Sequence, residues 1–134
     1  MKIEYSLQTV FSFEGPNLCF LGNESDFKLL ASSVVKLTDP FQDNQINLFD
    51  LDFPKPYEIN KEILFSSKKN SNSLAIIENE KIVFELDSRY WERLFKYFVL
   101  MSWDKRTYYL NSYENYLSEF ELEQDCYFVC SSEF

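Results

Sequence analysis

Histidine is missing from this 134-residue sequence, and glycine is nearly missing, with two residues against 14 phenylalanines and nine tyrosines. Without histidine, Ser-His and Cys-His catalytic pairs are excluded, and so is the side chain that most often acts as a base near neutral pH. Gly15 and Gly22 cannot form a phosphate-binding loop, because such loops need several glycines close together for the backbone to approach a phosphate. The sequence therefore predicts neither a nucleotide site nor an enzyme.

Positive charge is also scarce. The sequence has 13 lysine and arginine residues against 22 aspartate and glutamate residues, which gives a formal net charge of −9. A protein this anionic repels a phosphate backbone, so the composition predicts no nucleic-acid partner. The sequence has no apolar run of about 18 residues, and Glu4 interrupts the N-terminal segment where a signal peptide needs apolar residues. We therefore expect a cytoplasmic protein without a membrane partner.

Three cysteines are present, and an odd number does not indicate a disulfide framework. Cys126 and Cys130 lie four residues apart in an expected strand, which places both on one face. Further ligands are not evident, so we interpret both residues, together with Cys19, as buried free thiols. Asp50 and Asp52 in the strand-like segment INLFDLDF would also share a face, but a third oxygen ligand for Mg²⁺ is missing at motif spacing. The sequence predicts no metal and no cofactor.

The sequence has what a packed core requires. Of its residues, 46% are hydrophobic and 19% are aromatic, which excludes intrinsic disorder. A chain of 134 residues is typical of one domain, so we expect a single domain over residues 1–134.

The second half of the sequence predicts a ββαββ unit. Two β-branched and aromatic runs, Ser73–Glu78 and Lys81–Leu86, flank a two-residue turn as the strands of a hairpin. Asp87 or Ser88 then begins a helix, because an aspartate or serine side chain can accept hydrogen bonds from the first helical turn. The helix has an apolar stripe at Trp91, Leu94, Phe95, Phe98 and Val99. The strands that follow are Thr107–Leu110 and Cys126–Ser131.

The first half repeats this order 64 residues earlier. Val10–Glu14 and Leu18–Leu21 flank a turn at Gly15-Pro16-Asn17, and Asn23 or Ser25 begins the helix. The apolar stripe recurs without a gap at Phe27, Leu30, Ala31, Val34 and Val35. The closing strands are Ile46–Leu51 and Glu62–Ser67. We therefore expect internal repeats at residues 7–67 and 73–132.

Together these patterns predict an α+β fold of two tandem ββαββ units. In the expected arrangement, two helices pack on one face of a single antiparallel sheet. An alternative with the same elements gives each half its own small sheet.

Acidic side chains concentrate in two segments, each of which follows the helix of its unit. No lysine or arginine occurs after Arg106, and none lies between Lys36 and Lys55. Tyrosines are interleaved with acidic residues in the second segment, and tyrosine combines a large contact area with a polar tip. An acidic surface of this kind accelerates association with a basic partner. The candidate partner-binding residues are Tyr113, Tyr116, Glu119, Glu121, Glu123, Asp125, Asp50 and Asp52.

The layout of residues 74–134 resembles that of bacterial immunity proteins. A hairpin precedes a helix with a central tryptophan (SRYWERLFKYF), a tyrosine-rich strand follows (TYYLNSY), and a final strand leads to SSEF. Immunity proteins are the antitoxins encoded beside polymorphic or contact-dependent toxins, and they bind and block the toxin domain. The resemblance implies a cytoplasmic, non-catalytic inhibitor of a cognate toxin domain, with nucleases among the toxins of this kind.

Two other functions are compatible with the sequence. A structural or adaptor module that forms a homodimer through an exposed sheet edge would have the same features, and its oligomeric state would identify it. A carboxylate-dependent hydrolase that needs a metal is the third function, and stabilisation of the folded state by the metal would identify that one.

Overall fold

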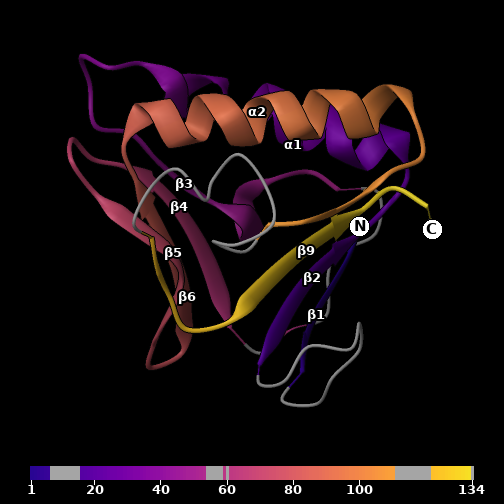
Figure 1. Ribbon diagram of the computed structural model, residues 1–134, viewed down its shortest axis with the longest axis horizontal. Coiled ribbons are helices and arrows are strands. Elements are labelled where there is room, and N and C mark those ends of the chain that lie inside the picture. Colours follow the sequence, from indigo (N-terminus) through magenta and orange to yellow (C-terminus); the bar gives the residue numbers. More distant parts are fainter. Residues whose placement is uncertain (7–15, 54–58, 60, 111–121, 134) are drawn as a thin grey trace.

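The protein folds into a mixed α+β structure with two helices and two sheets (Figure 1). The computed structural model describes residues 1–6, 16–53, 59, 61–110 and 122–133. The helices lie side by side as one layer, and the two sheets lie beneath it on either side (Figure 1). The α+β class predicted from the sequence is confirmed.

The first helix, α1 (Glu24–Val34), begins at a reciprocal cap. The Asn23 side chain accepts a hydrogen bond from the Asp26 amide at 2.9 Å, and the Asp26 carboxylate accepts one from the Asn23 amide at 3.0 Å. The α-amino group of Met1 lies 3.2 Å from the other carboxylate oxygen of Asp26, and both groups are buried. The cap thus satisfies N–H groups that have no partner within the helix, and it fixes the start of the chain.

The second helix, α2 (Ser88–Trp103), begins at Asp87, as the sequence predicted. One carboxylate oxygen of Asp87 accepts hydrogen bonds from the backbone and side chain of Arg89, and the other accepts one from the Asn70 amide at 2.9 Å. Burial raises the pKa of this carboxyl group, but the hydrogen bonds from Asn70 and Arg89, with the Arg89 charge, outweigh burial. The pKa of Asp87 therefore lies below its usual value.

Both helices turn their apolar stripes toward the core. The buried members of the stripes are Phe27, Leu30, Ala31 and Val34 in α1 and Trp91, Leu94 and Phe98 in α2. The ring of Phe27, near the start of α1, lies 6.2 Å from that of Phe98, near the end of α2, so the helices run antiparallel (Figure 1). Val35 is 50% exposed, because α1 passes there into the 3₁₀ helix η1 (Val35–Thr38).

Two sheets of four and five strands form the rest of the described structure. Sheet A has the strand order β1-β2-β9-β7, and sheet B has the order β3-β4-β6-β5-β8. The strands of sheet A are β1 (Lys2–Ser6), β2 (Asn17–Leu21), β7 (Thr107–Tyr109) and β9 (Tyr127–Ser131). Those of sheet B are β3 (Gln45–Asn47), β4 (Glu62–Ser67), β5 (Asn72–Glu78), β6 (Lys81–Leu86) and β8 (Glu123–Gln124). The pairs β2·β9, β4·β6 and β5·β8 are parallel, and the other four pairs are antiparallel.

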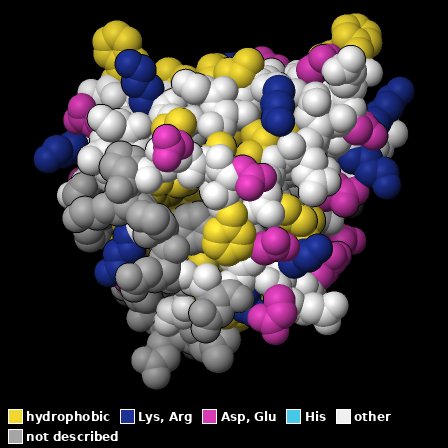
Figure 2. All heavy atoms as spheres, turned by 180° about the vertical axis from the view of Figure 1, so that it is seen from behind, with side chains coloured by type: hydrophobic (Ala, Val, Ile, Leu, Met, Phe, Trp, Pro, Cys, Tyr) yellow, Lys and Arg dark blue, Asp and Glu magenta, His cyan; other side chains and the backbone are white. Residues whose placement is uncertain are grey.

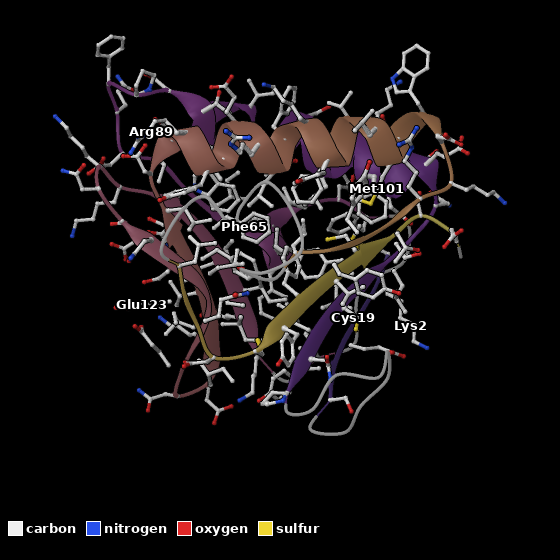
Figure 3. All side chains as sticks on the ribbon, viewed as in Figure 1. Lys2, Cys19, Phe65, Arg89, Met101 and Glu123 are labelled. Carbon is white, nitrogen blue, oxygen red and sulfur yellow. The ribbon has the colours of Figure 1, made fainter. Side chains whose placement is uncertain are left out.

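Aromatic side chains from both sheets and α2 meet in the core. The ring of Phe65 lies 4.8 Å from that of Trp91 and 4.9 Å from that of Phe84. The ring of Phe128 meets Phe20 and Phe84 edge to face, at 4.9 and 5.0 Å. Edge-to-face contacts suit the charge distribution of aromatic rings. Figure 3 shows Phe65 between the sheets and beneath the helix layer. The cluster therefore ties the two sheets to each other and to α2.

The predicted single antiparallel sheet is wrong, and so is the alternative of one sheet for each half of the chain. Each sheet combines the first two strands of one half with the closing strands of the other half, and the pair in the centre is parallel. The alternation of apolar and polar residues is the same in parallel and antiparallel strands, so the sequence pattern did not distinguish these arrangements.

One predicted hairpin also differs in its strands. The antiparallel partner of β2 is β1, whereas the predicted partner Val10–Glu14 lies outside the described residues.

Candidate docking face on sheet B

The helix layer, defined as residues 24–38 and 88–106, differs in charge from the rest of the chain. Its basic residues are Lys28, Lys36, Arg89, Arg93, Lys96, Lys105 and Arg106, and its acidic residues are Glu24, Asp26, Glu92 and Asp104. The layer therefore has a net charge of +3, and the remainder of the chain has −12, because the total is −9. In Figure 2, acidic side chains gather below the helix layer, on the side of sheet B.

Acidic residues line the β8 edge of sheet B. Glu123 lies opposite Ser73 at this edge, and Figure 3 shows its side chain beside β5. Asp125 follows and accepts a hydrogen bond from the amide of Ile77 at 2.8 Å. Glu78 and Glu80 are exposed at the adjoining turn between β5 and β6. The structure thus brings the two predicted residues Glu123 and Asp125 together with two further carboxylates.

Sheets A and B meet near Asp125, at the end away from the helices. The Lys61 ammonium lies 5.9 Å from the centre of the Tyr5 ring of β1, and it donates to the Asn79 carbonyl at 3.4 Å. Burial raises the pKa of Tyr5, and the neighbouring Cys126 and Asp125 raise it further. Asp125 is therefore part of a corner that joins the sheets, which gives it a structural role besides the predicted one.

The other described candidates, Asp50 and Asp52, lie beyond the opposite edge of sheet B. The predicted strand at Ile46–Leu51 is wrong in its second half, because the Asn47 side chain accepts a hydrogen bond from the Phe49 amide and begins the 3₁₀ helix η2 (Leu48–Asp50). Asp50 and Asp52 are both exposed, but they do not alternate along a strand. Sheet B separates them from Glu123 by four strand spacings, roughly 19 Å.

The remaining candidates from the sequence are Tyr113, Tyr116, Glu119 and Glu121, which lie outside the described residues.

Sheet B has a partly exposed apolar stripe on the face that points away from the core. Leu64 of β4 lies opposite Val83 of β6, which lies opposite Ile76 of β5. All three are partly exposed, whereas their strand neighbours Ile63, Phe65, Ile82 and Phe84 are fully buried. The sequence interpretation missed this stripe, although the alternation in EILFSS and KIVFEL already assigns Leu64 and Val83 to one face.

Ion pairs flank the stripe on the same face. Lys81 lies 3.9 Å from Glu62 on one side, and Lys68 lies 3.7 Å from Glu85 on the other. All four side chains are at least 36% exposed, so these pairs contribute little to stability. Because Lys81 and Lys68 are paired with Glu62 and Glu85, these lysines do not neutralise the acidic residues at the edges of the sheet.

Exposed apolar side chains elsewhere in the described structure are scattered. Phe41 is 91% exposed and Trp103 is 82% exposed, but they lie at opposite ends of α2, because η1 packs against the start of that helix. Single exposed aromatics are common on protein surfaces, so neither residue defines a patch.

The described residues contain no group of side chains that would hold a metal ion. Cys19, Cys126 and Cys130 are buried free thiols, as predicted. Burial raises the pKa of Cys19 to about 11 and that of Cys126 to about 12, so neither is a reactive thiolate at neutral pH. No helix in the described ranges is long and apolar enough to cross a membrane.

Comparisons with protein-family models, with curated proteins and with solved structures found no match to this chain.

Proposed function

We propose that the protein is a non-catalytic immunity protein that binds and blocks a basic toxin domain in the cytoplasm. The observation that carries this proposal is the separation of charge, with −12 outside the helix layer and acidic residues at both edges of sheet B. Complementary charge raises association rates and selects the partner. The resemblance of residues 74–134 to immunity proteins supports the same function.

Inhibition in this proposal is occlusion at one-to-one stoichiometry. A toxin that cleaves nucleic acid presents lysine and arginine side chains to bind phosphate, and carboxylates of the inhibitor occupy the same positions. Glu123, with Glu78 and Glu80 beside it, supplies such carboxylates from an exposed edge. Tyr113 and Tyr116 stay predicted aromatic anchors of this surface.

The test uses the polypeptide encoded beside this gene as the probe. We expect it to bind the purified protein at one-to-one stoichiometry in calorimetry, with an affinity that falls as salt increases. The double variant Glu80→Lys with Glu123→Lys should lower the affinity about tenfold or more, because it places repulsive charges at the contact. Glu92→Lys in the helix layer is the matched control and should leave the affinity unchanged.

Two results would contradict the proposal. A clean homodimer in light scattering that does not bind the neighbouring polypeptide would favour the adaptor function instead. Equal affinity of the double variant and the wild type would show that the acidic edge does not contact the partner.

We also infer that the two halves of the chain are copies of one ββαββ unit that exchange strands. The order β1-β2-β9-β7 of sheet A corresponds to β5-β6-β4-β3 of sheet B, with the same sequence of antiparallel, parallel and antiparallel pairs. Residues 64 apart hold the same positions, as Phe20 and Phe84 do in the core. Exchange of strands between two copies of one unit would produce this pairing.

A split chain tests the duplication. Fragments 1–69 and 70–134 each lack strands of both sheets, so each should be unfolded alone, whereas a mixture should regain the circular dichroism spectrum of the intact protein. A fragment that folds cooperatively alone would contradict the exchange of strands.

A further inference from the structure

Corresponding stripes lie on the outer faces of the two sheets. In sheet A, Cys19 of β2 lies opposite Val129 of β9, and Tyr109 of β7 lies opposite Val129 in turn. In sheet B, Val83 and Leu64 occupy the corresponding positions, and Val83 lies 64 residues after Cys19. The two stripes thus have the same place in the same strand order.

The stripes differ in exposure. Cys19 is 1% exposed and Val129 is not exposed at all, so with Leu21 they form a second buried cluster behind sheet A. Leu64, Val83 and Ile76 of the sheet B stripe remain partly exposed. The stripe of sheet A is therefore closed to solvent, and the stripe of sheet B is not.

We propose that the sheet B stripe is the centre of the surface that the basic partner covers, which rests on the proposed function above. Interfaces commonly have an apolar centre and a charged rim, and this stripe has both. The rim consists of Glu62, Glu85, Glu78, Glu80, Glu123 and Asp125 against Lys61, Lys68 and Lys81.

The charge of the rim selects the occupant. A rim with six acidic and three basic residues matches a protein domain with exposed lysine or arginine side chains. A second copy of this chain, docked by the same face about a twofold axis, would place acidic rim against acidic rim, which is unfavourable. The partner is therefore a basic protein with a small apolar contact at its centre.

The experiment measures the affinity of variants for the polypeptide encoded beside this gene. Val83→Arg places a cation and a longer side chain in the middle of the stripe, and we expect the affinity to fall about 100-fold, as for a central interface residue. Leu64→Thr with Val83→Thr places β-branched side chains, which strands favour, at both positions and should lower the affinity about tenfold. Leu100→Thr, on an exposed position of α2, is the matched control and should not change it.

A second readout follows the surface directly. A thiol introduced as Val83→Cys should react with a maleimide in the free protein and become protected when the partner is added. Leu100→Cys should react equally in both states. Circular dichroism and urea denaturation of every variant confirm that the fold is retained, and the conservative threonine pair covers the case in which the arginine variant does not fold.

The outcomes separate the two proposals. If the wild type binds and the stripe variants bind equally well, the stripe is not the docking surface, although the immunity function stands. If the wild type does not bind, the immunity function fails and the assignment of the stripe to a basic partner fails with it. If light scattering shows a dimer that Val83→Arg dissociates, the stripe contacts a second copy and the basic partner is wrong.

Discussion

Four strands of sheet B repeat the order and pairing of the four strands of sheet A, but the outer faces of the two sheets differ in exposure. Cys19 and Val129 of sheet A are buried on the outer face as completely as core residues, whereas Val83 and Leu64 of sheet B hold the corresponding positions and stay partly exposed. Burial of apolar side chains favours the folded state by about 25 cal/mol per Å². The stripe of sheet A thus contributes its whole apolar area to folding, whereas that of sheet B leaves part of its apolar area exposed.

The comparison teaches that topology alone does not identify a binding surface. The two stripes hold equivalent positions in their sheets, but one of the neighbouring strands contributes a different kind of side chain. Glu4 lies opposite Cys19 in sheet A, and Ile76 lies opposite Val83 in sheet B. Each stripe therefore has three apolar members, and the stripe of sheet B lies on the face with the less complete cover.

The difference in exposure between the two sheets should have its largest effect on the reactivity of thiols at the corresponding positions 19 and 83. In the native protein, Cys19 should be almost unreactive toward Ellman's reagent at neutral pH, because the thiol is buried and its pKa is raised to about 11. The variant Val83→Cys should react at least about 1,000 times faster, since exposure controls thiol reactivity. Equal rates for the two thiols would mean that the outer faces do not differ.

A buried charge gives the next largest effect. Val129→Asp should lower the free energy of unfolding by about 4 kcal/mol, because the carboxylate would be buried without a partner. Val83→Asp at the corresponding stripe should cost only about 1 kcal/mol, the span of strand propensities. Urea denaturation of both variants measures the difference, and similar losses would contradict the exposure of the sheet B stripe.

The cap of α2 at Asp87 makes the stability of the protein depend on pH. Asp87→Asn should destabilise the protein by about 2 kcal/mol at neutral pH, since asparagine has one acceptor oxygen in place of two and no charge, so it cannot accept from both Asn70 and Arg89. The pKa of Asp87 is lowered by folding, so its contribution is present above the unfolded pKa of about 3.9 and is lost as the pH falls through the lower folded pKa. The difference in stability between wild type and variant should therefore shrink at acid pH, and a constant difference would assign the effect to something other than this charge.

The smallest expected effect is that of a substitution in the turn between β5 and β6. Asn79 connects β5 to β6 with a φ of 54°, in the left-handed region that asparagine tolerates better than most residues. Asn79→Ala should cost about 1 kcal/mol, and Asn79→Gly should be neutral or slightly stabilising. Thermal unfolding of both variants checks the order, and an alanine variant as stable as the glycine variant would contradict it.

Much of the local structure was predictable from the sequence. The strands β4 and β6 have the predicted bounds, and the caps at Asn23 and Asp87 are among those predicted. These features depend on neighbouring residues, which is why alternation and capping chemistry were sufficient. The strand predicted through Asp50 is wrong for a local reason, because the Asn47 side chain accepts a hydrogen bond from the Phe49 amide and begins a 3₁₀ helix there.

The pairing of strands and the docking face were not predictable in the same way. Parallel pairing of β4 with β6 arises because β6 is inserted between β4 and β5 in sheet B, and no local pattern encodes that order. Acidic residues were recognisable as a group, but their distribution over opposite edges of sheet B depends on the same pairing. The alternation of side chains along β4 and β6 assigns Leu64 and Val83 to one face of the sheet, but it does not show that this face stays partly exposed.

The position of β9 in the centre of sheet A has a consequence for how the protein is made. Tyr127–Ser131 is inserted between β2 and β7, although it is synthesised after every other described strand. A ribosome that has finished β2 must therefore release more than 100 further residues before the neighbour of that strand is available. Until then the hairpin of β1 and β2 has an unpaired edge, and an unpaired strand edge favours aggregation of an incomplete chain.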